Sequence, residues 1–227
     1  MKRLLILLII ISFGMMSSLS LAKKGLEDFP EYTVEGLKRI PHPESLTVVY
    51  AEPGANLAQY QRVYLTEPLV AFKKNWQRDK NRKVGTNIST HDMDRIKKAA
   101  AELFTDVFRK ELEKGGYQLV QERAEDVLIV KPAILDLDIP VPDSISATRG
   151  GSYSRDFGSM TMYVELYDSE TDDLLAKALD KRESHDSLYM HENSRPFIRQ
   201  QARRMMEPWA EALRDGLDRA RQETGED

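Results

Sequence analysis

Residues 160–181, MTMYVELYDSETDDLLAKALDK, predict the β-hairpin on which the fold depends. Apolar side chains take every second position of the first half, and polar or aromatic ones lie between them. The apolar set is Met160, Met162, Val164 and Leu166, and the other set is Thr161, Tyr163, Glu165 and Tyr167. This period of two is the pattern of a half-buried strand. The acidic run from Asp168 to Asp173 predicts the turn, and residues 174–181 predict the returning strand.

Further elements are predicted on both sides of this hairpin. Strands are expected at 46–50, 60–66, 117–120 and 127–139, where apolar and β-branched residues cluster. A helix is expected from the capping residue Ser89 to Lys114, and a second from about Ser194, with a kink or break near Pro208. Together they predict an α+β fold: a single, largely antiparallel sheet of about five to six strands with two main helices packed on one face.

The first 22 residues have the order of a secretory signal peptide. Lys2 and Arg3 precede an apolar run, and small residues end at Ala22, where cleavage is expected. An uncleaved N-terminal anchor is the alternative, and no later segment is apolar enough to span a membrane. We therefore expect a periplasmic or otherwise exported protein. Its parts would be the signal (1–22), an extended arm (23–45), a single α+β domain (46–222) and a disordered acidic tail (223–227).

Composition excludes several classes of function. The chain has no cysteine, which removes disulfides, thiolate chemistry and a lipid-modified cysteine. Its net charge is −4 and becomes more negative when the signal is removed, so nucleic acid is not an expected partner. No motif indicates a cofactor.

Four segments carry a resemblance to a known family: 50–68, 126–138, 165–176 and 209–221. They resemble a family of exported bacterial envelope proteins catalogued as domain of unknown function 3313. The hairpin and the pair Trp209-Ala210 are the most specific of these features. The resemblance implies export, often as a lipoprotein, and supplies no catalytic residues. Because this chain lacks the junction cysteine, a lipid anchor is not expected here.

A cluster of cations is the most unusual local feature of this otherwise acidic chain. It lies in 73–91, which reads as a long exposed loop, and comprises Lys73, Lys74, Arg78, Lys80, Arg82 and Lys83, with Trp76 among them. An aromatic side chain beside cations suits an anionic membrane or glycan. A solvated loop with Trp76 folded back on the domain is the simpler interpretation. The favoured function is a non-enzymatic envelope protein that binds a protein, peptidoglycan or an anionic membrane surface.

The alternative is a hydrolase-like envelope enzyme assembled from dispersed residues. Its candidates are His185, His191, Asp136 and Asp138. The segment from His91 to Asp94 offers an imidazole and two carboxylates, but these acids are also typical of a first helical turn. No recognised metal spacing occurs, so neither a metal nor a catalytic residue is expected.

Overall fold

The predicted hairpin forms the centre of the main sheet. In a computed structural model that describes residues 29–41, 45–83, 87–142, 145, 153–155, 157–184 and 189–223, β8 (Ser159–Asp168) pairs antiparallel with β9 (Leu174–Glu183). The Asp168 carboxylate accepts the backbone N–H groups of Glu170 and Thr171, each at 2.8 Å, which closes the turn. β6 (Val127–Asp138) lies on the other side of β8, also antiparallel. The predicted signal peptide, His42, His185 and most of the loop after Pro142 lie outside the described residues.

Five short strands extend this centre to eight, so the prediction of five to six strands is wrong. β2 (Val48–Ala51) and β1 (Lys38–Arg39) continue beyond β9 in antiparallel pairing. Beyond β6, the strands β3 (Arg62–Leu65), β4 (Leu69–Phe72) and β5 (Gln118–Leu119) add three parallel pairings. Of these five, β2, β3 and β5 lie where strands were predicted. The strands β1 and β4 were not predicted, because two and four residues are too few to show a clear period of two. β7 (Tyr153–Ser154) and β10 (His191–Glu192) form a separate two-stranded ribbon.

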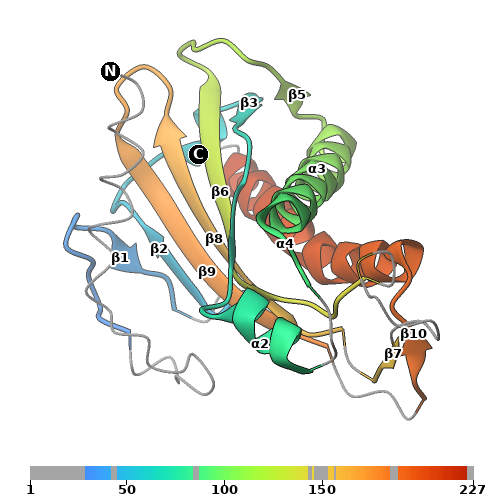
Figure 1. The fold of residues 1–227 in the computed structure, drawn as a ribbon. Coiled ribbons are helices and arrows are strands. Elements are labelled where there is room, and N and C mark those ends of the chain that lie inside the picture. Colours follow the sequence, from blue (N-terminus) through green and yellow to red (C-terminus); the bar gives the residue numbers. More distant parts are fainter. Residues whose placement is uncertain are drawn as a thin grey trace.

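The two long helices cover one face of the main sheet (Figure 1). α3 (Thr90–Lys114) begins at the predicted capping box, in which Ser89 and Asp92 satisfy each other's backbone N–H groups. α4 (Arg195–Glu223) passes through Pro208 without a break, so the break is wrong and the kink remains the prediction for this position. Proline removes one backbone hydrogen bond, and the fully buried Trp209 beside it holds this part of the helix against the core. None of the described helices has the length and apolarity of a membrane span.

A third helix, α2 (Trp76–Lys83), occupies the segment predicted as an exposed loop, and that prediction is therefore wrong. The Gln77 and Asn81 side chains hold the backbone of Ile88: Gln77 donates to its carbonyl at 2.7 Å, and Asn81 accepts its N–H at 2.8 Å. A short 3₁₀ helix at Leu57–Gln59 completes the described elements.

One buried carboxylate ties the helical layer to the sheet. Asp180 on β9 is 7% exposed and accepts four hydrogen bonds. Thr47 donates its backbone N–H (3.0 Å) and its hydroxyl (2.7 Å) to one carboxylate oxygen. The indole of Trp209 (2.7 Å) and the guanidinium of Arg182 (3.1 Å) donate to the other. A single side chain thus joins β9, the entry to β2 and α4.

Part of the predicted N-terminal arm lies against the sheet. Leu37 packs with Val48 and Tyr50 in a second, smaller hydrophobic cluster. The Tyr50 hydroxyl donates to the Pro30 carbonyl at 2.9 Å, and Glu35 pairs with Lys177 on β9 at 2.7 Å. The predicted arm therefore supplies β1, the strand at this edge of the sheet, and packs against β2.

Candidate functional site

The aromatic member of the predicted basic segment points into the protein. Trp76 is 3% exposed and stacks on Phe72, with ring centroids 4.3 Å apart. Its indole N–H donates to the backbone carbonyl of Ile139 at 3.1 Å. A buried tryptophan usually combines such apolar contact of its ring with a hydrogen-bond partner for its N–H. In this conformation Trp76 anchors α2 and presents no surface to a partner.

The cations of the same segment divide into two groups. Lys73 and Lys80 both pair with Asp138 at 2.9 Å, which fastens α2 to the end of β6. Burial raises the pKa of the Asp138 carboxyl, but hydrogen bonds from Lys80 and Lys73 outweigh it and hold the pKa below its usual value. Three of the others lie outward: Lys74 and Arg82 are exposed, and Arg78 pairs with the neighbouring Asp79 at 3.0 Å. The side chain of the last predicted cation, Lys83, lies outside the described part of the structure.

Two of the four residues of the enzyme alternative, His191 and Asp138, are held by other contacts. His191 lies in the ribbon, where its ring stacks on Phe197 at 5.0 Å. Asp138 is committed to two lysines, and Asp136 is an exposed residue with a left-handed φ of 49°. Among the described residues, no group of three or more His, Asp or Glu side chains is placed to hold a metal ion. The remaining candidate, His185, lies outside the described residues.

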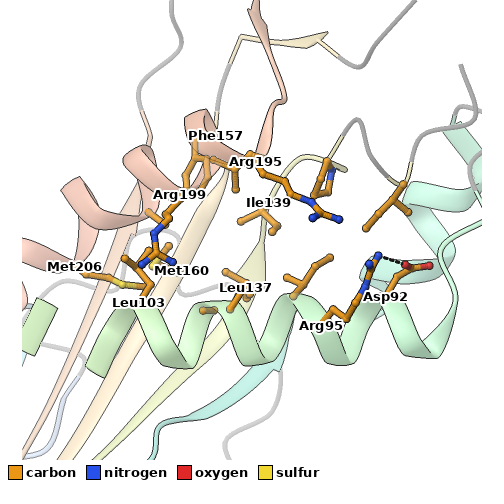
Figure 2. Close-up of a pocket in the computed structure, with 17 residues that line it drawn as sticks. Asp92, Arg95, Leu103, Leu137, Ile139, Phe157, Met160, Arg195, Arg199 and Met206 are labelled. Atoms are coloured by element: carbon orange, nitrogen blue, oxygen red, sulfur yellow. Dashed lines mark hydrogen bonds and ion pairs between the residues drawn. The ribbon is translucent and has the colours of Figure 1, made fainter. Parts of the chain in front are cut away.

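A cavity lies between α3, α4 and the ends of β6 and β8 (Figure 2). Its volume is about 350 Å³, within the range of small-molecule sites. Most of its lining is apolar, and the side chains come from elements far apart in the sequence. The apolar lining comprises Ile96, Ala99, Ala100, Leu103, Leu137, Ile139, Pro142, Ile145, Phe157, Met160, Ile198, Ala202 and Met206.

Small side chains on the facing helices create this space. Ala99 and Ala100 on α3 and Ala202 on α4 line it, where larger residues would fill the gap between the two helices. Leu137 and Met160, both almost fully buried, supply lining from the sheet. The cavity therefore continues the hydrophobic core towards the surface.

The charged side chains of the lining are Asp92, Arg95, Arg195 and Arg199, and the three arginines are exposed where the cavity meets solvent. Figure 2 shows Arg95 and Arg195 at one end and on opposite sides, with Asp92 beside Arg95. Arg95 pairs with Asp92 at 2.6 Å, so the charge of this arginine is already neutralised. Arg199 also lines the cavity and has no ion-pair partner among the described residues. An apolar interior with arginines at the opening suits a ligand that has an apolar body and an anionic head.

Sequence reasoning missed this cavity. Arg195 and Arg199 have the spacing of a solvated helix face, and the alanines are ordinary helix formers. The available signal was the recurrence of small residues on the apolar faces of two long helices, at 99–100 and 202. That signal does not say which helices face each other.

Comparisons with known proteins identify the family but give no activity. Residues 31–213 match the family described as "Protein of unknown function (DUF3313)", and the chain belongs to that family. No curated protein matches the sequence. Among solved structures, a PelC dodecamer variant from Paraburkholderia phytofirmans is similar with a TM-score of 0.39 and 12% identity, over 73% of this chain and 95% of that one. A protein described as a neuraminyllactose-binding hemagglutinin homologue from Helicobacter pylori gives a TM-score of 0.38 and 10% identity, over 77% and 95%. At these scores the likeness says nothing about what this chain binds.

Proposed function

We propose that this member of the DUF3313 family is an exported, non-enzymatic binding protein of the bacterial envelope, and that it holds an anionic amphiphile between α3 and α4. The apolar cavity of about 350 Å³ with arginines at its mouth is the observation that carries the proposal. The ligand class is a molecule with one acyl chain and a carboxylate or phosphate head. Export rests on the order of residues 1–22, and the mature chain would begin at Lys23 in the periplasm.

The apolar interior would supply most of the affinity. Each buried methylene contributes about 0.8 kcal/mol, which corresponds to about fourfold in the dissociation constant. A charge-assisted hydrogen bond from an arginine at the mouth would fix the head and select anions. Because Arg199 is exposed to solvent, its contribution to the binding free energy is smaller than that of a buried ion pair.

Calorimetry with straight-chain carboxylates, from octanoate to tetradecanoate, tests the proposal directly. We expect the affinity of the mature protein to rise about fourfold per added methylene until the cavity is filled, and then to level off. Dodecanol, which has no charge, should bind less tightly than dodecanoate. Heats that do not saturate, or an affinity indifferent to chain length, would refute the proposal.

Two pairs of variants separate the cavity from its mouth. Arg199→Gln should lower the affinity for dodecanoate by about threefold to tenfold and leave the affinity for dodecanol unchanged. Arg204→Gln is the matched control, because Arg204 is an exposed arginine on the same helix that does not line the cavity. Ala100→Phe should fill the cavity and abolish binding of both ligands, and Ala202→Phe provides a second filling variant if the first is unstable. Circular dichroism and thermal unfolding check that each variant folds.

We also propose, from its charge, that the basic segment 73–83 contacts an anionic envelope surface. With Trp76 buried and Lys73 and Lys80 paired, the exposed side chains left for this contact among the described residues are Lys74, Arg78 and Arg82. Binding to vesicles that contain phosphatidylglycerol should fall with added salt and in a triple Lys/Arg→Gln variant of these three residues. If vesicle binding is the same with added salt and in the triple variant, the segment does not make this contact.

A further inference from the structure

The two-stranded ribbon β7–β10 has one face towards the domain and one towards solvent. Ser154 and His191 are direct cross-strand partners on the inner face. The Ser154 hydroxyl donates to the buried Asn193 side chain at 2.7 Å, and the His191 ring stacks on Phe197 of α4. Strand alternation therefore sends the neighbours of Ser154 and His191 outward.

The outer face of the ribbon is apolar, aromatic and cationic. Tyr153 is 52% exposed and Met190 is 59% exposed, and both alternate with the inward residues. Tyr189, just before β10, is 75% exposed. Arg155 is exposed beside Tyr153, and Glu192 is the only acid within the two strands. Large apolar side chains left this exposed on a projecting ribbon mark a surface that meets something else.

This ribbon lies beside the mouth of the cavity. Only Asn193 and Ser194 separate β10 from Arg195, which begins α4 and lines the cavity. The stack of His191 on Phe197 fixes the ribbon to the first turn of the same helix. Figure 1 shows β7 and β10 at the end of α4 where that helix begins. If the protein docks through the ribbon, the opening of the cavity therefore lies close to the surface to which the protein is bound.

We infer that the ribbon docks the protein on an anionic lipid bilayer, so that the cavity exchanges its amphiphile with the membrane. The inference rests on the proposed function. Tyrosine favours the interface between headgroups and acyl chains, where its ring is apolar and its hydroxyl is hydrated. The Arg155, Arg195 and Arg199 guanidinium groups complement anionic headgroups around it. A bilayer is also the phase in which amphiphiles of this class reside, which favours it over a protein partner.

The inference can be tested by sedimenting the mature protein with vesicles. One set contains equal parts of phosphatidylglycerol and phosphatidylcholine, and the other contains phosphatidylcholine alone. We expect binding to the anionic set that weakens with salt. Tyr153→Ser combined with Met190→Ser should reduce this binding at least tenfold, and Arg155→Gln should reduce it about fivefold. Tyr32→Ser is the matched control, because Tyr32 is similarly exposed, at 50%, on the N-terminal segment.

Binding of dodecanoate, measured in parallel without vesicles, separates the two proposals. The ribbon variants should keep wild-type affinity for dodecanoate, whereas Ala100→Phe should lose it and still bind vesicles. Failure of the wild-type protein to bind dodecanoate would refute the proposed function, and with it the exchange of the amphiphile, whereas the docking surface itself is decided by the vesicle assay. Ribbon variants that bind anionic vesicles like the wild type would overturn the docking surface, as would equal binding to both vesicle sets. Cross-linking of the wild-type ribbon to an envelope protein, with no vesicle binding, would identify a protein interface and likewise overturn it.

Discussion

Replacement of Asp180 by alanine should be among the most damaging single changes in this fold. The substitution removes a carboxylate that accepts four hydrogen bonds, two from Thr47 and one each from Trp209 and Arg182. Trp209 is fully buried, so its indole N–H has no access to water and would remain unsatisfied. An unsatisfied buried donor costs about 1–3 kcal/mol, and Arg182 would lose its counter-charge as well. We expect a loss of about 3–5 kcal/mol in the free energy of unfolding.

Urea unfolding followed by tryptophan fluorescence measures this loss. A domain of this size should lose about 6–20 °C in melting temperature for the same change. Trp209→Phe keeps most of the ring packing and removes the donor, so it should cost less than Asp180→Ala. The double variant should be more stable than the sum of the single losses predicts, because both changes break the same hydrogen bond. Asp94→Ala is the control, since Asp94 is exposed on α3 and makes no ion pair with another described residue.

A loss below about 1 kcal/mol for Asp180→Ala, or strict additivity in the double variant, would contradict the role assigned to this carboxylate. Either result would mean that apolar packing alone holds α4 on the sheet.

Three further outcomes follow from other contacts. Gly158→Ala should cost at least about 3 kcal/mol in urea unfolding, because Gly158 has a φ of +103° and an added Cβ would lie 1.8 Å from the Asp138 carbonyl; a stable variant would show that the backbone can move away. In the Asp138→Asn variant, the free energy of unfolding should fall less steeply than in the wild type as the pH is lowered. Ion pairs lower the pKa of Asp138, so its contribution is present above the unfolded pKa and is lost as the pH falls through the folded value; an unchanged fall at low pH would contradict this. Burial and the hydrogen bond to Asp168 raise the pKa of Tyr60 to about 12. Its contribution should therefore be present below about pH 10 and lost as the pH rises towards 12, a loss that Tyr60→Phe removes from alkaline unfolding curves.

The parts of the fold that sequence predicts are those with a strong local signal. The alternation in 160–166 needs only period two, and the start of α3 needs only the spacing of Ser89 and Asp92. α2 gives no such signal, because its sequence WQRDKNRK is almost wholly polar and one residue, Trp76, supplies the apolar anchor. β4 is hidden by Pro68, which follows β3 so closely that the two strands read as one strand and a loop.

The candidate site is harder to predict because it is a space and not a segment. Ala100 and Ala202 lie about a hundred positions apart, and only the packing of α3 against α4 makes them walls of one cavity. Arg199 and Arg204 are both exposed arginines on α4, yet only Arg199 lines the cavity. Position in three dimensions gives one arginine a role that its neighbour lacks.

Under the proposed function, the alanines that line the cavity would also limit the length of the ligand. A larger side chain at any of these positions would occupy part of the cavity and leave less room for an acyl chain. The capped start of α3 and the sheet would not be changed by such a substitution. Family members that carry valine or leucine at positions 99, 100 or 202 would accept shorter chains, and members with phenylalanine there would accept none. Chain-length preference could thus diverge within the family through single substitutions, without a change of fold.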